Sequence, residues 1–255
     1  MDRFTGKVVV VAGGASGMGA ETSRRLAREG AAVAVGDINL AGAEQVAAEI
    51  TAAGGKAVSA EFDLADEASV EALMQKASDV YGGIDAMFAV AADLSDETVR
   101  ADTNAVEIDI EVFDRILRTD LRGYLFCCRY AIPRLLERGG GAIVCTSTDG
   151  TFNAQPSRVA YCAAKAGVTT LVRHVAARWG REGIRCNAVS PGLIQTPPAL
   201  RQLTPEFRDA ALARVLSTRL GEAADIAGCV AWLLSEDADW VTGQVISVNG
   251  GLVVR

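Results

Sequence analysis

Tyr161 and Lys165 stand four residues apart at the start of a helix-like segment. This spacing places both side chains on one face of a helix. A tyrosine hydroxyl ordinarily has a pKa of about 10, and a neighbouring ammonium lowers that pKa by stabilising the phenolate. The pair can therefore act as a general acid or base at an oxygen. A Tyr/Lys pair on a helix is also a common amphipathic surface feature, so it predicts catalysis only together with a second motif.

The second motif is the glycine-rich segment 13–19, which lies between a short apolar run and a helix-like segment. Glycines let the backbone turn tightly and approach a pyrophosphate, and the helix N-terminus that follows offers free amides to the anion. A glycine motif alone is weak, but the strand–loop–helix context makes this one typical of a nucleotide site. The residues predicted to bind the nucleotide here are Gly13, Ala15, Ser16, Gly17, Met18 and Gly19.

Asp37 ends the next apolar run and is followed by Ile38, with no Lys or Arg beside it. A carboxylate at this position can accept hydrogen bonds from the ribose hydroxyls of an adenosine and would repel a 2′-phosphate. The alternative is a strand-end Asp that caps the turn before Asn39. On this spacing we expect NAD to be preferred over NADP.

With these motifs in order, the chain resembles the short-chain dehydrogenase/reductase family over its whole length. The family's loop glycines match Gly13, Gly17 and Gly19, and its Tyr-x-x-x-Lys motif matches Tyr161 and Lys165. The resemblance extends to the family's adenine-facing pair, its Asn-x-x-x-Pro-Gly segment, its nicotinamide-gripping residues and its closing strand. The corresponding residues are Asp63 and Leu64, then Asn187, Pro191 and Gly192, then Ile194 and Thr196, and finally the segment 242–251.

The resemblance implies hydride transfer between a nicotinamide and a carbonyl or carbinol carbon. Tyr161 would exchange the proton of the substrate oxygen, while Lys165 would tune Tyr161 and bind the nicotinamide ribose. The resemblance also implies a homotetramer built partly on the helices that follow Asp120 and Tyr161.

The chain departs from the family pattern at three places. Ala12 replaces the first Thr of the loop motif, and Ala89-Val90-Ala91-Ala92 replaces the family's Asn-Asn-Ala-Gly. Losing polar groups on both sides avoids leaving one of them unsatisfied, so we interpret the change as repacking and keep Ala89 and Ala91 in the predicted cofactor site. Asp120 stands where the family usually has an Asn, which adds a negative charge near Lys165.

The hydroxyl that would hold the substrate oxygen is either Ser147 or Thr148. The family's spacing from Tyr161 points to Thr148, whereas its local Ser-x-x-Gly pattern points to Ser147, three residues before Gly150. Either side chain is a competent donor. The turn geometry slightly favours Ser147.

Apolar runs and helical segments alternate along the chain, which predicts an α/β fold: a doubly wound, Rossmann-type, seven-stranded parallel sheet with helices on both faces. The predicted strands are Lys7–Ala12, Ala32–Asp37, Ala57–Phe62, Asp85–Ala91, Ala142–Thr146, Ile184–Val189 and Gln244–Val248. The predicted helices are Glu21–Glu29, one ending near Gly54, Glu67–Tyr81, Ile110–Glu137, Ala160–Trp179 and Ala223–Leu234.

Two segments that follow strands interrupt this alternation and should overhang the carboxyl edge of the sheet, where ligands bind. Segment 93–109 is acidic and is interpreted as a solvated loop. Segment 193–218 is predicted to be a substrate lid, and its apolar residues favour a largely hydrophobic hydroxy or keto substrate. Those residues are Leu193, Leu200, Leu203, Phe207 and Leu212, which Phe152 would join.

Length and composition are consistent with one dinucleotide-binding and catalytic domain over residues 1–255. A net charge of −7 and a pI near 4.9 argue against nucleic-acid binding, and no apolar stretch is long enough to span a bilayer. A single histidine and six cysteines without a Cys-x-x-Cys pair predict no metal site and buried free thiols in a cytoplasmic protein.

Two hypotheses from different classes remain. The first is an NAD-dependent short-chain alcohol dehydrogenase or ketone reductase (EC 1.1.1.-) acting on a small molecule. The second is a non-catalytic protein of the same fold that senses NAD(H) or scaffolds a partner, and the departures at Ala12, Ala89–Ala92 and Asp120 keep it open. The intact Tyr161 and Lys165 favour the enzyme.

Overall fold

The computed structural model, which describes residues 2–202 and 204–254, contains a seven-stranded parallel sheet. The strand order is β3-β2-β1-β4-β5-β6-β7, so the order reverses between β1 and β4. This confirms the predicted doubly wound α/β fold. The strands are β1 (Val8–Ala12), β2 (Ala32–Asp37), β3 (Lys56–Glu61), β4 (Ala86–Ala89), β5 (Gly141–Thr146), β6 (Ile184–Pro191) and β7 (Val245–Val248).

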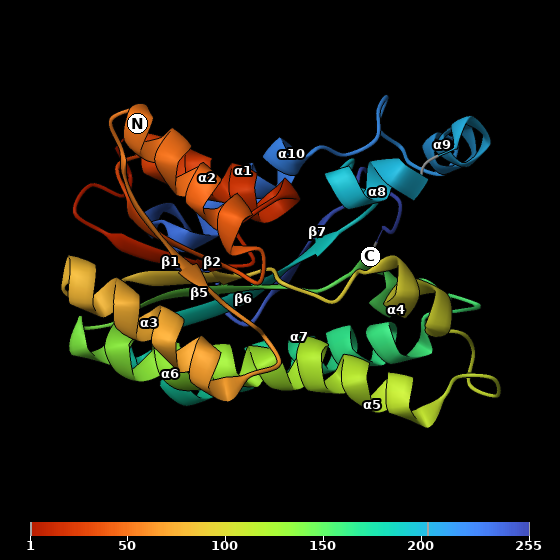
Figure 1. Ribbon diagram of the computed structural model, residues 1–255, viewed down its shortest axis with the longest axis horizontal. Coiled ribbons are helices and arrows are strands. Elements are labelled where there is room, and N and C mark those ends of the chain that lie inside the picture. The colour runs from red at the N-terminus through yellow and green to blue at the C-terminus, as the bar shows by residue number, and fades with distance from the viewer. Residues whose placement is uncertain (1, 203, 255) are drawn as a thin grey trace.

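Helices cover both faces of the sheet (Figure 1). One face carries α1 (Gly17–Arg28), α2 (Leu40–Ala52) and α10 (Ala223–Leu234). The other carries α3 (Glu67–Tyr81), α5 (Ile110–Leu117), α6 (Gly123–Glu137) and α7 (Val159–Trp179). The short helices α4 (Asp96–Ala101), α8 (Pro197–Gln202) and α9 (Pro205–Leu212) lie at the carboxyl edge of the sheet.

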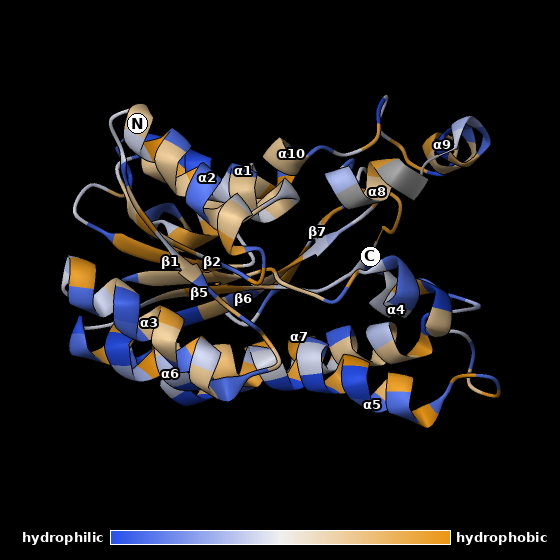
Figure 2. Cartoon of the chain, viewed as in Figure 1, coloured by the Kyte–Doolittle hydropathy of each residue, from blue (hydrophilic) through white to orange (hydrophobic). Residues whose placement is uncertain are grey.

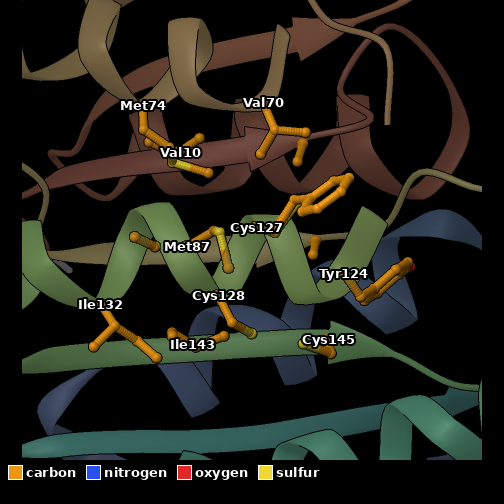
Figure 3. Packing of buried hydrophobic residues seen from close by; sticks show 14 of the residues in the cluster. Val10, Val70, Met74, Met87, Tyr124, Cys127, Cys128, Ile132, Ile143 and Cys145 are labelled. Atoms are coloured by element: carbon orange, nitrogen blue, oxygen red, sulfur yellow. The ribbon is translucent and has the colours of Figure 1, made fainter. Parts of the chain in front are cut away.

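The two faces of the sheet bury two apolar clusters, because strands covered on both sides can be apolar at every position. All five residues of β1 are at most 4% exposed. Figure 2 shows the strands coloured as hydrophobic and the outward helix faces as hydrophilic. Figure 3 shows one cluster, where α6 presents Tyr124, Cys127, Cys128 and Ile132 to the sheet.

All six cysteines are free. Cys127, Cys128, Cys145 and Cys186 are buried as expected, whereas Cys162 and Cys229 are half-buried. In the part of the chain that the structure describes, no helix is long and apolar enough to cross a membrane.

Three differences between the predicted and the observed element boundaries bear on the site. Helix α1 starts at Gly17, four residues before Glu21, so the helix begins inside the glycine loop. Strand β4 ends at Ala89 rather than Ala91. The expected helix over 110–137 is interrupted at Arg118–Arg122 by a π-helical turn that contains Asp120, a feature often found at functional sites.

The interpretation of segment 93–109 as a solvated loop is also wrong in part. The segment contains α4, and Thr98 and Asp102 are only 4% and 2% exposed. Segment 193–218 contains α8 and α9, whose apolar side chains Leu200 and Phe207 are about half exposed. The predicted lid residue Leu203 lies outside the described residues.

Candidate active site

The glycine loop is packed so closely that side chains are excluded from it. A Cβ at Gly19 would lie 1.9 Å from the carbonyl oxygen of Gly13, and one at Gly13 would lie 2.5 Å from the amide nitrogen of Ala91. Gly13 also adopts a φ of 105°, which disfavours any other residue. The loop is thereby fixed against the end of β4, with the N-terminus of α1 directly behind it. This strand–loop–helix cradle suits a pyrophosphate.

Asp37 lies at the end of β2, half-buried beside that cradle. Its Oδ2 accepts a 2.9 Å hydrogen bond from the amide of Ala15, and its Oδ1 accepts one of 3.0 Å from the amide of Asn39. The turn-capping role considered for Asp37 is therefore present. The same contacts hold the carboxylate next to the loop, where its remaining lone pairs can face a ribose. Ile38 beside it is 70% exposed.

The other residues predicted to bind the cofactor lie around the same edge. Thr196 lies over the glycine loop, since a Cβ at Gly17 would be 3.0 Å from its Cγ2. Pro191 ends β6, and Ile194 is buried beside Gly221. The backbone of Asp63 and its side chain are held by Ser69 and Ala65.

Leu64 packs against α6. Its side chain is buried 2.5 Å from where a Cβ of Gly123 would lie, on α6. The carbonyl oxygen of Leu64 packs against Gly123 as well, 2.4 Å from where that Cβ would lie.

The substitutions at Ala12 and Ala89–Ala92 are accommodated by backbone hydrogen bonds. The carbonyl of Ala12 accepts hydrogen bonds of 2.9 Å from the amides of Val90 and Ala91. The hydroxyl of Thr146 donates to the carbonyl of Ala89 over 3.0 Å. Both Ala12 and Ala89 are almost completely buried. The strands are joined without the family's polar side chains, as the repacking interpretation predicts.

Tyr161 is positioned by a cap from another part of the chain. The buried carboxylate of Asp102 accepts hydrogen bonds of 2.9 Å from the amides of Ala160 and Tyr161 in the first turn of α7. The carbonyl of Asp102 also accepts a 2.8 Å hydrogen bond from the amide of Arg158. A carboxylate at a helix N-terminus satisfies free amides and interacts favourably with the helix dipole. Asp102 therefore fixes where α7, and with it Tyr161, begins.

Lys165 lies one turn further along α7 and is 1% exposed. Its Nζ donates a 2.9 Å hydrogen bond to the hydroxyl of Tyr124, which in turn donates to the carbonyl of Ala91 over 3.1 Å. Nζ lies 5.7 Å from the centroid of the Tyr161 ring, so the two motif residues share one face as expected. Burial lowers the pKa of Lys165, while the Coulomb attraction of Asp120 raises it.

Arg158 is the cation nearest to the Tyr161 ring. Its guanidinium Cζ lies 4.0 Å from the ring centroid. Burial raises the pKa of Tyr161 to about 12, whereas Arg158 and a hydrogen bond with Thr148 act to lower it. The expectation that Lys165 would be the lowering cation is therefore incomplete, because Arg158 lies closer to the ring.

The two candidate hydroxyls point in different directions. The hydroxyl of Ser147 is buried and donates a weak 3.4 Å hydrogen bond to the carbonyl of Lys165. The hydroxyl of Thr148 accepts a 3.3 Å hydrogen bond from the amide of Gly150, and its interaction with Tyr161 acts to lower the pKa of that tyrosine. The slight preference for Ser147 is therefore not supported by the geometry. Adjacent residues at the strand end face opposite sides, and it is Thr148 that faces Tyr161.

Asp120 is fully buried in the π-helical turn. Its Oδ1 accepts a 3.1 Å hydrogen bond from the amide of Asp93, and its Oδ2 has no hydrogen-bond partner among the described residues. Burial raises the pKa of Asp120, an effect that Lys165 partly offsets. No ion pair within the described chain joins it to Arg118 or Arg122.

Sequence reasoning missed three residues of this site: Asp102, Tyr124 and Arg158. Arg158 stands three residues before Tyr161, but its left-handed backbone places it outside α7, so helical spacing does not identify it. Asp102 and Tyr124 reach the site through tertiary packing, and no local pattern identifies them. Within the described residues, no three His, Cys, Asp or Glu side chains are arranged to hold a metal ion.

Comparisons with known proteins agree with this geometry. A family model described as enoyl-(acyl carrier protein) reductase matches residues 12–253. A probable short-chain type dehydrogenase/reductase of Bradyrhizobium diazoefficiens is 42% identical over 255 residues, covering 100% of this chain and 90% of the relative. The 7alpha-hydroxysteroid dehydrogenase of Bacteroides fragilis is 36% identical over 255 residues, covering 100% of this chain and 97% of the relative.

A solved structure is similar along nearly the whole chain. It is a 7 alpha-hydroxysteroid dehydrogenase complexed with NADH and 7-oxo glycochenodeoxycholic acid. The TM-score is 0.91 at 29% sequence identity, with 98% of this chain and 95% of that chain covered.

Proposed function

The chain belongs to the short-chain dehydrogenase/reductase family of oxidoreductases, and we propose that it interconverts a secondary alcohol and a ketone with NAD(H). The observation that carries this proposal is the arrangement at the start of α7. The side chain of Thr148 interacts with that of Tyr161, and the buried ammonium of Lys165 lies one helical turn further along α7. These groups can hold an oxygen and exchange its proton.

The residues around the glycine loop fit a dinucleotide. Gly13–Gly19 and the N-terminus of α1 would hold the pyrophosphate, Asp37 the adenosine ribose, and Ile194 and Thr196 the nicotinamide end. NAD(H) would supply the hydride acceptor or donor, and the protein orients it. The similar solved structure contains NADH, which supports the same cofactor here, and Asp37 supports NAD over NADP.

In the proposed reaction Tyr161 accepts the hydroxyl proton during oxidation and returns it during reduction. Thr148 donates a hydrogen bond to the substrate oxygen and keeps it beside Tyr161. Lys165 contributes positive charge and is held in place by Tyr124. At neutral pH a tyrosine with a pKa of about 12 is protonated, so it can donate a proton to a carbonyl oxygen but must lose that proton before it can act as a base. The free protein is therefore set for protonating a carbonyl oxygen, and oxidation should be faster at alkaline pH.

The 7-oxo ligand of the similar structure supports a ketone on a ring as the substrate class. Segment 193–218 would cover such a substrate, since Leu200 and Phe207 leave apolar surface exposed there. Family resemblance supports a homotetramer, which light scattering on the purified protein would test.

The function is tested by following NADH absorbance while a panel of secondary alcohols is offered with NAD. Tyr161→Phe should remove nearly all turnover, while NADH binding, followed by fluorescence titration, stays close to the wild-type value. A Phe variant that retains substantial activity would show that Tyr161 does not move the proton. A protein that binds NADH but oxidises or reduces nothing in the panel would favour the sensor hypothesis.

A further inference from the structure

The backbone of Arg158 is held in an unusual conformation next to the reacting tyrosine. Its φ of 67° and ψ of 41° are left-handed, and among the described residues it is the single non-glycine with a positive φ. A non-glycine residue in this region is strained, and the strain persists only where surrounding contacts impose it. Here the contact is the 2.8 Å hydrogen bond from the amide of Arg158 to the carbonyl of Asp102. The fold therefore enforces the direction in which this side chain leaves the backbone.

The side chain ends against Tyr161 with unused hydrogen-bonding capacity. Its Cζ lies 4.0 Å from the Tyr161 ring centroid, and its Nε is buried without a hydrogen-bond partner among the described residues. None of the ion pairs within the described chain includes Arg158. A buried N–H group without a hydrogen-bond partner costs free energy of folding. The Nε edge of a guanidinium is one of the edges that can bind a carboxylate through two parallel hydrogen bonds.

None of the charged groups near Arg158 within the described chain accepts a hydrogen bond from its Nε. The carboxylate of Asp102 is occupied by the amides of Ala160 and Tyr161. Asp120 interacts with Arg158 only through space, and its Oδ1 is occupied by the amide of Asp93. Lys165 is a second cation. The guanidinium is therefore a positive charge at the reacting centre that no carboxylate of the described chain neutralises through an ion pair.

Arg158 is one of the residues that line a cavity of about 500 Å³. The cavity is also lined by the loop after β5, by the segment that begins at Thr103, and by Cys162 on α7. Arg158 thus contacts both this cavity and the Tyr161 ring. A group that occupies this cavity is therefore beside the guanidinium, which itself contacts the Tyr161 ring.

We propose that Arg158 binds a carboxylate of the substrate, so that the protein acts on hydroxy acids and oxo acids rather than on wholly apolar alcohols. This rests on the proposed oxidoreductase function and narrows its substrate class. It revises the expectation of a largely hydrophobic substrate, because the exposed apolar residues of segment 193–218 would contact the carbon skeleton while Arg158 contacts the acid.

A different role for the same residue is to tune Tyr161 alone, since the guanidinium stabilises the phenolate. Tuning would affect acids and neutral alcohols equally, whereas carboxylate recognition affects acids only. The ratio of kcat/KM for an acid to that for its amide therefore separates the two roles.

The experiment measures NAD-dependent oxidation of 4-hydroxycyclohexanecarboxylate and 3-hydroxybutanoate, each beside its carboxamide. We expect the wild type to prefer an acid over its amide by about ten- to a hundred-fold, the range for a hydrogen bond to a charged group. Arg158→Gln should bring that ratio to about one, and Arg158→Lys should keep part of it. Arg181→Gln, which removes an exposed charge just beyond the far end of α7, should keep the wild-type ratio. An unchanged ratio in Arg158→Gln would overturn the proposal.

Binding supplies a readout that does not depend on turnover. Cyclohexanecarboxylate and cyclohexanecarboxamide are titrated calorimetrically into the protein–NADH complex of the wild type and of Arg158→Gln. Tighter binding of the carboxylate that disappears in the variant supports the site, even if no alcohol is oxidised and the proposed function fails. Oxidation of neutral alcohols without any preference for the carboxylate in either assay would keep the function and refute the role of Arg158.

Discussion

The buried ammonium of Lys165 donates a 2.9 Å hydrogen bond to the buried hydroxyl of Tyr124. The Tyr124 hydroxyl in turn donates a hydrogen bond to the carbonyl of Ala91, so one chain of hydrogen bonds joins α7, α6 and the loop after β4. Figure 3 places Tyr124 on the face of α6 that packs on the sheet. The loop after β4 is where the family's Asn side chains are replaced by alanines. Tyr124 therefore supplies a polar group at a point where the chain has lost others.

Tyr124→Phe should destabilise the protein, because the buried ammonium loses its acceptor while the packing of the ring is retained. The expected loss in the free energy of unfolding is about 1–3 kcal/mol, the cost of leaving a buried polar group unsatisfied. Urea denaturation measures it. Tyr130→Phe on the same helix removes a hydroxyl that bonds to Glu67 in a solvent-accessible setting, and should cost no more than about 0.5 kcal/mol. Equal losses in the two variants would contradict a special role for Tyr124.

Thr148→Ala should lower kcat more than Ser147→Ala does. The Thr148 side chain interacts with Tyr161, where the substrate oxygen would lie, whereas the Ser147 hydroxyl is buried against the carbonyl of Lys165. Losing a donor to the reacting oxygen commonly costs about a hundred-fold or more in kcat. Steady-state kinetics on both variants, with a matched thermal unfolding curve for each, separate loss of chemistry from loss of fold. The reverse order would identify Ser147 as the donor.

Much of the fold was predictable because its signals are local. Apolar runs such as 7–12 and 32–37 alternate with helical segments, and the doubly wound topology follows from that alternation and the right-handed crossover rule. The loop glycines, Asp37 and the Tyr161–Lys165 spacing were predictable for the same reason. Each depends on residues that are neighbours along one element or one turn.

What could not be predicted depends on contacts between distant segments. Asp102 caps α7 from 58 residues away, and Tyr124 meets Lys165 from another helix. The direction of Ser147 and Thr148 depends on the register between β5 and β6, where the amide of Ser147 donates to the carbonyl of Val189. The π-helical turn at Asp120 breaks a helix whose apolar pattern gave no sign of it. Spacing along the sequence does not contain this information.

Asp37→Ala should weaken the preference for NAD over NADP. The carboxylate is held beside the glycine loop by the amide of Ala15, where it can bond to a ribose and repel a 2′-phosphate. The ratio of kcat/KM for NAD to that for NADP should fall at least about ten-fold, mainly through KM. Glu44→Ala removes an exposed carboxylate from the neighbouring helix α2 and should leave the ratio unchanged. Equal use of both cofactors by the wild type would refute the assignment of Asp37.

Asp120→Asn should change how stability depends on pH. Burial raises the pKa of Asp120 above its ordinary value, so the folded protein holds this proton more tightly than the unfolded chain. The stabilisation is fully present below the unfolded pKa and is lost as pH rises through the folded pKa. The free energy of unfolding of the wild type should therefore fall relative to that of Asp120→Asn as pH rises above about 4, the ordinary pKa of an Asp carboxyl group. Asp114→Asn, an exposed carboxylate on α5, should show no such trend.

The same substitution should move the alkaline rise of the alcohol oxidation rate to lower pH. At alkaline pH the Asp120 carboxylate is ionised, and its charge raises the pKa of both Tyr161 and Lys165. In the Asn variant Tyr161 loses a repelling charge, so its phenolate should form more readily and its pKa should fall below about 12. Lys165 also loses an attracting charge, so its pKa should fall and less ammonium should be present at alkaline pH. Arg158 lies closer to the Tyr161 ring than Lys165 does and stays charged, so losing ammonium should change the pKa of Tyr161 less than losing the Asp120 charge does. A kcat/KM profile against pH for wild type and Asp120→Asn measures the difference. An unchanged apparent pKa would eliminate Asp120 as a tuner of Tyr161, and an upward shift would mean that its effect passes through the ammonium of Lys165.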